Sequence, residues 1–208
     1  SKVVCVGLNY KAHAEELGYP LPNMPSFFLK PPSSIIGNGE PIVLPSGMGR
    51  IEHEAELAMV VGKVCRNLTP EEAEESLFGF TCANDVTARE VQKVDPLIGH
   101  CKSYDTFCPI GPWIETELED INDLSIRCLV NGEVRQSANT GDMIFRPLDL
   151  LCFLSRVMTL MPGDVILTGT PPGISPIQAD DVVQVSIEGI GTLSNPVEGP
   201  GPEEKILQ

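Results

Sequence analysis

Residues 51–61, Ile-Glu-His-Glu-Ala-Glu-Leu-Ala-Met-Val-Val, decide which kind of fold the chain can adopt. In an extended strand alternate side chains point to opposite faces, so the apolar residues at 55, 57, 59 and 61 share one face. The carboxylates of Glu52, Glu54 and Glu56 share the other face, as in a solvent-facing edge strand. Ala58 and Val60 continue the acidic face, however, which favours an enclosed position. The stretch therefore predicts a β-strand that carries carboxylates into the interior.

Enclosed carboxylates must be neutralised by a cation or by protonation, because burying an unpaired charge is costly. Ligation by carboxylates alone suits a hard divalent ion such as Mg²⁺ or Mn²⁺. Asp85 follows the mostly apolar stretch 78–83 and could supply a further ligand, but it could equally cap a helix that starts at Thr87. The residues alone leave both roles open. Two or three carboxylates would leave coordination positions open for a chelating substrate.

Short apolar runs between many turn residues, 19 Gly and 19 Pro in 208 residues, predict a mainly β fold with peripheral short helices. Strands are expected at 3–6, 27–30, 40–44 and 164–168, with hairpins at 126–134, across Asn131-Gly132, and at 182–197. Helices are expected at 10–17, with Asn9 as N-cap, at 70–77, at 87–93 and from Pro147 onward. Strands and helices do not alternate regularly, so a mixed or antiparallel arrangement is favoured over a parallel βαβ fold.

The composition excludes one class of partner. Only 14 Lys and Arg oppose 29 Asp and Glu, a net charge of −15, so binding of nucleic acid is not expected. No apolar run is long enough for a membrane span and no signal peptide is recognisable, which predicts a soluble cytoplasmic protein without a membrane partner. The seven cysteines lack any C-x-x-C pair and are expected to be buried, reduced thiols. Trp113 is expected in the core.

Six motifs resemble those of the fumarylacetoacetate hydrolase family. They are residues 4–10 followed by His13, then 28–31, 53–57, 84–89, 102–109 and 163–171. They follow the order found in the family and extend over nearly the whole chain. The resemblance implies a single catalytic domain at 1–208, of the mixed β-sandwich or β-roll type that the family adopts. It also implies a short lid helix within 1–25, and the absence of the N-terminal extension that many members carry.

The resemblance also assigns roles to residues of this chain. One Mg²⁺ or Mn²⁺ ion per site, for which Ca²⁺ could substitute, would be held by Glu54, Glu56 and Asp85. Catalysis would use a His-x-x-Glu pair on the lid and a lysine, namely His13, Glu16 and Lys102. Substrate oxygens would be bound by Arg89, Gln92, Thr170 and Lys30. His53 adjoins the ligands on the opposite strand face and is expected to have a supporting role.

Members of the family act on small 2-oxo or 2,4-dioxo acids, and two reaction types are expected here. One is hydrolytic C–C cleavage of the acylpyruvate or fumarylpyruvate type, in which His13 would activate water and Glu16 would orient the imidazole. The other is keto-enol isomerisation of the 2-hydroxyhepta-2,4-diene-1,7-dioate type. Both pass through an enolate that the metal stabilises. Oxaloacetate decarboxylase or tautomerase activity is an alternative, as is a non-catalytic metal- or carboxylate-binding domain. The partners implied are an anionic oxo acid and a second copy in a homodimer.

Overall fold

The computed structural model describes residues 1–95 and 97–199, and β-strands form most of it. The strands are β1 (Val3–Gly7), β2 (Ser26–Lys30), β3 (Ile35–Ile36), β4 (Ile42–Val43), β5 (Ile51–Glu52), β6 (Ala55–Val61), β7 (Leu77–Asn84), β8 (Thr87–Ala88), β9 (Cys108–Glu115), β10 (Ser125–Val130), β11 (Glu133–Asn139), β12 (Val165–Leu167), β13 (Val182–Ile187) and β14 (Gly191–Glu198). The helices are α1 (Lys11–Leu17), α2 (Pro70–Ser76), α3 (Arg89–Val94), α4 (Gly99–Lys102) and α5 (Pro147–Val157), with 3₁₀ turns at Pro32–Ser34 and Thr140–Asp142.

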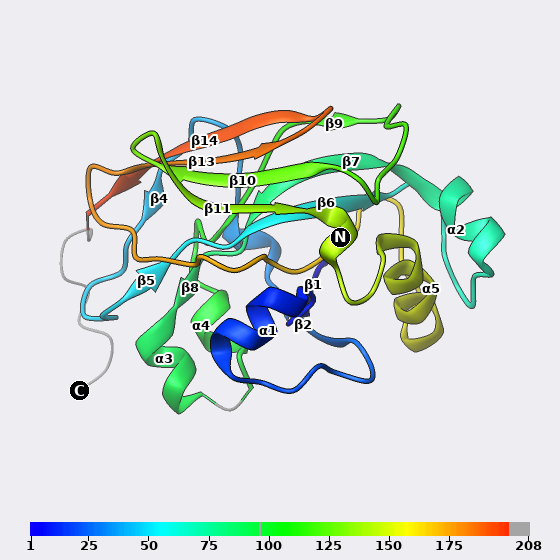
Figure 1. The fold of residues 1–208 in the computed structure, drawn as a ribbon, viewed down its shortest axis with the longest axis horizontal. Helices are drawn as coiled ribbons and strands as arrows, with labels where there is room; N and C mark the ends of the chain where they lie inside the picture. Colours follow the sequence, from blue (N-terminus) through cyan, green and yellow to red (C-terminus); the bar gives the residue numbers. More distant parts are fainter. Residues whose placement is uncertain (96, 200–208) are drawn as a thin grey trace.

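Two large sheets form the framework (Figure 1). A seven-stranded sheet has the order β2-β1-β12-β6-β7-β9-β3, and a five-stranded sheet has the order β11-β10-β13-β14-β4. Most neighbouring strands are antiparallel, but β1 pairs with β12, β3 with β9 and β4 with β14 in parallel. This is the mixed, mainly β architecture with short peripheral helices that the sequence predicts. None of the helices in the part of the chain that the structure describes is long and apolar enough to cross a membrane.

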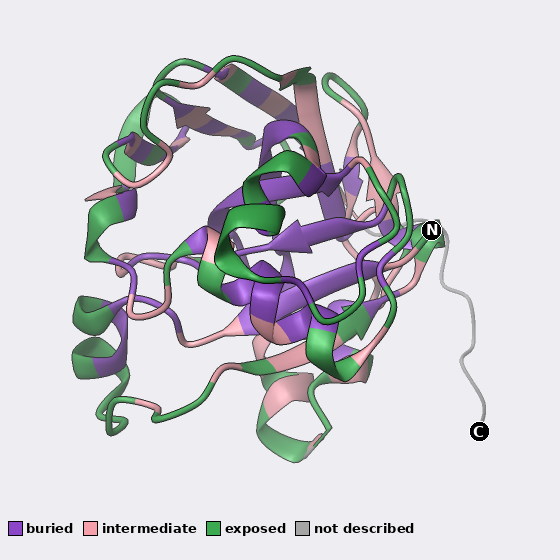
Figure 2. Cartoon of the chain, turned by 90° about the vertical axis from the view of Figure 1, so that its right-hand side faces the viewer, coloured by how far each residue is buried: buried purple, intermediate pink, exposed green. Residues whose placement is uncertain are grey.

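All seven residues of strand β6 are buried, and Figure 2 shows buried strands, in purple, at the centre of the molecule. Leu57 and Met59 belong to the main core, which also contains residues of the five-stranded sheet such as Ile126. Ala58 points the other way, into a smaller cluster with Val3. The prediction of an enclosed strand is therefore confirmed. The prediction that it runs unbroken over 51–61 is wrong, since β5 and β6 are separated at residues 53–54.

Elements with strong local signals form where they were predicted. Asn131 and Gly132 both have positive φ, 53° and 81°, and join β10 to β11 in the expected hairpin. Thr69 and Glu72 form a capping box at the start of α2. Helix α5 begins at Pro147 as expected, and β13 pairs with β14 across the turn at 188–190. Sequence chemistry confined to a few residues is sufficient in each case.

Two predicted elements differ because distant contacts override local preference, and a third is shorter than predicted. Asn9 does not cap the first helix, which begins at Lys11 after Tyr10, since its side chain binds distant backbone groups instead. The helix expected at 87–93 begins at Arg89, because Thr87 and Ala88 form β8 and pair with β5. The strand expected at 40–44 is reduced to the two residues of β4.

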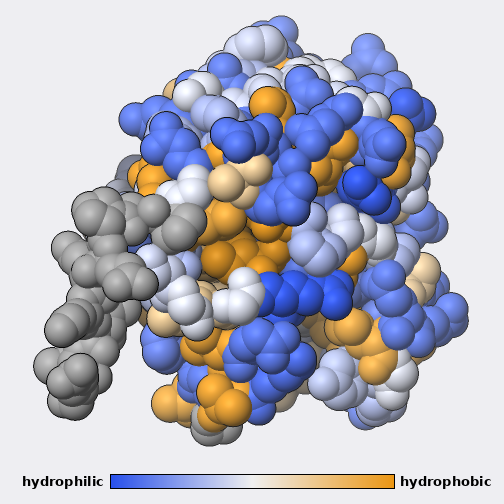
Figure 3. Space-filling view, turned by 90° about the vertical axis from the view of Figure 1, so that its left-hand side faces the viewer, coloured by the Kyte–Doolittle hydropathy of each residue, from blue (hydrophilic) through white to orange (hydrophobic). Residues whose placement is uncertain are grey.

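The predictions of burial are right for the cysteines and wrong for the single tryptophan. All seven cysteines are buried and free, as predicted. Trp113 lies on β9 with 58% of its surface exposed, so its placement in the core is wrong. Val94 and Leu97 near α3 are also exposed. Hydrophobic side chains gather in the middle of the face that Figure 3 shows, and hydrophilic ones surround them.

Candidate active site

Three carboxylates meet where β6 begins and β7 ends. Glu56 lies on β6, while Glu54 and Asp85 lie beside the two strand ends. The side-chain oxygen of Asn84 accepts the Glu54 N–H at 2.9 Å, and the Asp85 N–H donates to the Glu54 carbonyl at 2.8 Å, which locks the two segments together. One oxygen of each carboxylate lies within 4.8 Å of the others, and all three residues are buried. The structure thus brings together the ligand set that the family resemblance implies.

Two lysines neutralise part of this cluster from within the protein. The Lys102 Nζ donates to Glu54 at 2.7 Å and to Asp85 at 2.6 Å, and the Lys30 Nζ donates to the other oxygen of Asp85 at 2.5 Å. Both ammonium groups are almost fully buried. Asp85 therefore orients lysines rather than capping α3, whose N-cap residue Ala88 receives no side-chain cap. Burial opposes the charge of Lys102, but Asp85 and Glu54 outweigh burial and raise its pKa, so it remains an ammonium ion.

Glu56 has no ion-pair partner among the residues that the structure describes. Its carboxylate accepts only the Gly169 N–H, at 2.5 Å. Burial, and then the charges of Asp85 and Glu54, raise its pKa well above the ordinary carboxyl value, while Lys102 and the Gly169 N–H oppose the rise. A buried carboxylate beside two others is the donor that a divalent cation would neutralise. The donor set therefore fits a hard ion such as Mg²⁺ or Mn²⁺.

Glu52 extends the charged network from the carboxylate cluster toward the surface. One of its oxygens accepts the Arg89 Nε–H at 2.5 Å, and the other forms an ion pair with Arg50. Arg89 also donates to Glu54 and, at 2.8 Å, to the side-chain oxygen of Gln92. Burial alone would raise the pKa of Glu54, but Lys102 and Arg89 together lower it, so Glu54 is ionised. The sequence analysis placed Glu52 on the acidic strand face only, and it assigned no role to Arg50.

The first helix brings its histidine and glutamate to the same region as the carboxylates. The His13 Nδ1 lies 2.9 Å from a Glu16 oxygen, and the other Glu16 oxygen accepts the Gly173 N–H at 3.0 Å. At the base of the helix, the Asn9 amide donates to the carbonyls of Phe145 and Thr168. These bonds tie helix α1, the expected lid, to chain segments more than 130 residues away in sequence.

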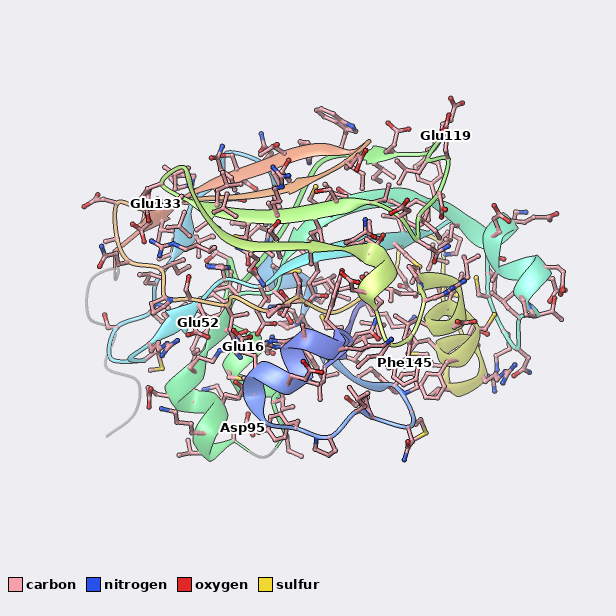
Figure 4. All side chains as sticks on the ribbon, viewed as in Figure 1. Glu16, Glu52, Asp95, Glu119, Glu133 and Phe145 are labelled. Carbon is pink, nitrogen blue, oxygen red and sulfur yellow. The ribbon has the colours of Figure 1, made fainter. Side chains whose placement is uncertain are left out.

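A cavity of about 800 Å³ collects these groups in one place, and nine of the ten predicted site residues line it. Figure 4 labels three wall residues from different elements, Glu16 on α1, Glu52 on β5 and Asp95 after α3. Lys30 is the exception, because it lies behind Asp85 with its ammonium also bonded to the Phe107 carbonyl at 2.7 Å. A substrate contact is therefore not expected of Lys30.

Gln136 supports the site from the neighbouring sheet, a role that the sequence did not reveal. Its oxygen accepts from the Ala55 N–H and from the His53 Nδ1–H, both at 3.0 Å, and its NH₂ donates to the Thr170 hydroxyl at 2.8 Å. The Thr170 hydroxyl in turn donates to the Ala55 carbonyl, so its proton is already committed. Burial lowers the pKa of His53, and its ring bonds to Gln136 and, through Nε2, to the Ser175 hydroxyl, in agreement with the supporting role expected of it. No local signal marks Gln136, which lies 81 residues from Ala55.

The fold and the cavity together define a class of protein, mixed β-roll proteins with a three-carboxylate site beneath a short helix. The family model described as "Fumarylacetoacetate (FAA) hydrolase C-terminal" matches residues 2–198, so the chain belongs to the fumarylacetoacetate hydrolase family. The crystal structure of a 5-carboxymethyl-2-hydroxymuconate delta-isomerase from Mycobacterium smegmatis superposes with a TM-score of 0.91 at 48% identity, over 97% of this chain and 80% of that chain.

Two further relatives carry names that bear on the chemistry. A maleylpyruvate hydrolase from Sphingobium sp. SYK-6, solved in complex with manganese(II) and pyruvate, has a TM-score of 0.84 and 37% identity, over 96% of this chain and 71% of that chain. A mitochondrial oxaloacetate tautomerase of Xenopus laevis is 42% identical over 94% of this chain and 65% of the relative. Family members that resemble this chain thus include an isomerase, a hydrolase and a tautomerase.

Proposed function

We propose that the protein is a divalent-metal-dependent enzyme that hydrolyses a C–C bond of a small 2,4-dioxo acid. The observation that carries this proposal is the His13–Glu16 pair, which lies in the wall of the same cavity as Glu54, Glu56 and Asp85. A base beside a cation site is the arrangement that activation of water requires. The cavity volume of about 800 Å³ also leaves room for a substrate longer than a four-carbon acid.

Glu54, Glu56 and Asp85 would hold one Mg²⁺ or Mn²⁺ ion. When bound, such an ion supplies Lewis-acid chemistry, which polarises the oxygens of the oxo acid and offsets the negative charge of the enolate that leaves. Manganese in the maleylpyruvate hydrolase supports this choice of ion. Within the network, four cations (Lys30, Arg50, Arg89, Lys102) face four carboxylates (the three ligands and Glu52). A divalent ion would therefore give this network a net positive charge, which would attract an anionic oxo acid toward it.

The remaining steps follow from the chain's own side chains. Because the Nδ1 of His13 is bonded to the Glu16 carboxylate, the Nδ1 carries the proton and the Nε2 is left to accept one from water. Glu16, itself held by the Gly173 N–H, fixes the orientation of the ring. Lys102 remains protonated, so it offers positive charge to the developing enolate rather than acting as a base. The NH₂ of Gln92 and the remaining N–H groups of Arg89 would bind substrate oxygens.

Keto-enol tautomerisation is the second candidate, and the oxaloacetate tautomerase relative favours it. The same cation site would stabilise the enolate, but no water would be activated, so His13 would be dispensable. A non-catalytic binding domain is the remaining candidate. The homodimer implied by the family resemblance is part of the proposal, and light scattering on the purified protein would test it.

The test compares His13→Ala with His100→Ala, a histidine outside the cavity wall that bonds to Tyr104. Ultraviolet absorbance would follow hydrolysis of acylpyruvates and enolisation of oxaloacetate, each with and without Mn²⁺. If the protein is a hydrolase, His13→Ala should lower the rate of C–C cleavage at least 100-fold and leave the rate of enolisation unchanged. His100→Ala should leave both rates unchanged. Equal loss of both activities in His13→Ala would contradict the assigned role of the pair. Absence of Mn²⁺-dependent turnover in the wild-type protein would favour the non-catalytic domain.

A further inference from the structure

Lys30 is a buried lysine beside the carboxylate cluster that does not reach the cavity. It ends β2, and its side chain is fully buried. Its Nζ donates to the Asp85 Oδ1 at 2.5 Å and to the backbone carbonyls of Phe107 and Val86, at 2.7 and 3.4 Å. An ammonium group has three N–H donors and no acceptor, so these three bonds use all of its capacity. Lys30 therefore has no hydrogen bond left to offer to a substrate.

The two oxygens of Asp85 consequently face different groups. Oδ2 accepts from the Lys102 Nζ, which also donates to Glu54, so Oδ2 is the oxygen on the side of the other carboxylates. Oδ1 faces Lys30, which lies outside the cavity wall. The main chain of Asp85 is fixed as well, because its N–H donates to the Glu54 carbonyl at 2.8 Å. The carboxylate cannot turn without breaking a buried hydrogen bond.

This arrangement affects which ion Asp85 can bind. Ca²⁺ takes roughly six to eight oxygens and often binds both oxygens of a carboxylate, whereas Mg²⁺ requires a compact octahedron. If an ion took both oxygens of Asp85, Oδ1 would have to leave Lys30, and the ammonium would remain buried without its anionic partner, which is costly. Binding through Oδ2 alone keeps the bond to Lys30. The arrangement therefore penalises Ca²⁺ more than a smaller ion.

We infer that Lys30 is a positioning residue that makes Asp85 a ligand through one oxygen, and so directs the site toward Mg²⁺ or Mn²⁺ and against Ca²⁺. The inference rests on the cation site of the proposed function and adds its selectivity. It also accounts for a charged side chain that is buried beside the site without contacting the cavity. Lys102 differs in this respect, because it lines the cavity and bonds to two of the three carboxylates.

Isothermal titration calorimetry with Mg²⁺ and with Ca²⁺ tests the inference without substrate or turnover. The measured quantity is the ratio of the two affinities in each protein. In Lys30→Met the Asp85 Oδ1 loses its partner, so the ratio should shift at least about tenfold toward Ca²⁺ relative to the wild-type protein. Loss of the lysine charge should raise the affinity for both ions, and a partly unfolded sample would bind less of both. Neither effect changes the ratio.

Lys2→Met is the matched control. The Nζ of Lys2 also bonds to a carboxylate, that of Asp164, and to a backbone carbonyl, that of Thr159, but none of these residues lines the cavity. Distant sites act almost independently, so the affinity ratio should stay within about twofold of the wild-type value. An unshifted ratio in Lys30→Met would overturn the inference. An equal shift in Lys2→Met would also overturn it, because general loosening of the fold would then explain both results.

Crystal structures of the wild-type protein loaded with each ion provide a second test, which holds even if Lys30→Met does not fold. Asp85 should bind each ion through Oδ2 alone, with the bond between Lys30 and Oδ1 kept. Coordination of Ca²⁺ by both oxygens of Asp85 would overturn the inference. Failure of the proposed hydrolysis would appear separately, as absent turnover of 2,4-dioxo acids while the shift in the affinity ratio persists.

Discussion

The replacement Glu56→Gln separates the role of this carboxylate in stability from its role in cation binding. Glu56 is buried and accepts only one backbone N–H, whereas nearby Glu52 is equally buried but pairs with two arginines. Glutamine has nearly the same shape as glutamate; it removes the charge, replaces one oxygen by an NH₂ group and keeps one acceptor oxygen. We therefore expect opposite effects from the same substitution at the two positions. Glu56→Gln should stabilise the metal-free protein, and Glu52→Gln should destabilise it.

The magnitude follows from the separation of the three carboxylates. Their nearest oxygens lie within 4.8 Å, where two like charges repel by roughly 3 kcal/mol at an effective dielectric constant of 20. Lys102 offsets part of this repulsion, and partial protonation of Glu56, whose pKa is raised, removes another part. A net gain of about 1 to 3 kcal/mol in the free energy of unfolding remains for Glu56→Gln at pH 8. Affinity for Mn²⁺ should fall at least 100-fold, which corresponds to about 2.7 kcal/mol.

Urea unfolding at pH 8, first with EDTA and then with Mn²⁺, measures both effects. A concentration of Mn²⁺ near 100 times its Kd should stabilise the wild-type protein by about 2.7 kcal/mol and leave Glu56→Gln almost unchanged. The decisive observation is whether Glu56→Gln raises or lowers the free energy of unfolding in EDTA. If Glu56→Gln is destabilised as much as Glu52→Gln, or if it keeps the full Mn²⁺ effect, Glu56 is not an uncompensated cation ligand and the reasoning fails.

Three further predictions concern other parts of the chain. Gly173→Ala should reduce the rate of hydrolysis about tenfold or more, while affinity for Mn²⁺ persists. Gly173 has a φ of +96°, and a Cβ at this position would lie 2.2 Å from the Arg135 carbonyl oxygen, so the substitution would displace the N–H that holds Glu16. An unchanged kcat would refute this prediction. Asp164→Asn should flatten the acid limb of stability against pH. Burial opposes ionisation of Asp164, but Lys2 and the Met161 N–H lower its pKa below the usual 3.8. The ionised Asp164 therefore stabilises the folded protein above that value, and this stabilisation is lost as the pH falls through the lowered pKa. An unaltered pH dependence of the free energy of unfolding in urea titrations below pH 4 would contradict this prediction. Burial raises the pKa of the cysteines, to about 12 for Cys82, Cys108 and Cys128. Fewer than one thiol per folded chain should therefore react with a thiol reagent at pH 7.5, and all seven should react after unfolding.

Turns and helix starts that depend only on neighbouring residues could be predicted from the sequence. The Asn131-Gly132 turn and the Thr69 capping box need only neighbouring residues, and both form. Asn9 looked like a helix cap for the same kind of reason, yet its amide serves carbonyls 136 and 159 residues away. No short window of sequence contains that information. Tertiary contacts therefore decided where the first helix begins.

Part of the candidate site could likewise be predicted from the sequence, and part depends on tertiary contacts. The alternation of residues in 51–61 predicted enclosed carboxylates, and the family resemblance added Asp85, His13 and Glu16, which the structure brings to one cavity. The same resemblance placed Lys30 on the substrate, whereas its ammonium lies behind Asp85. Gln136 has no motif, and its position is set by the pairing of the five-stranded sheet.

The internal neutralisation of the carboxylate cluster has a consequence for how the enzyme matures. Lys30, Lys102 and Arg89 already compensate most of the acidic charge of the cluster, so we expect the polypeptide to complete its folding in the absence of any ion. Loading would then be a separate, later event on a finished scaffold, unlike small zinc domains that collapse only around their metal. Ions could be exchanged without unfolding, and the species found in the protein would reflect the cell's supply of divalent metals at the time.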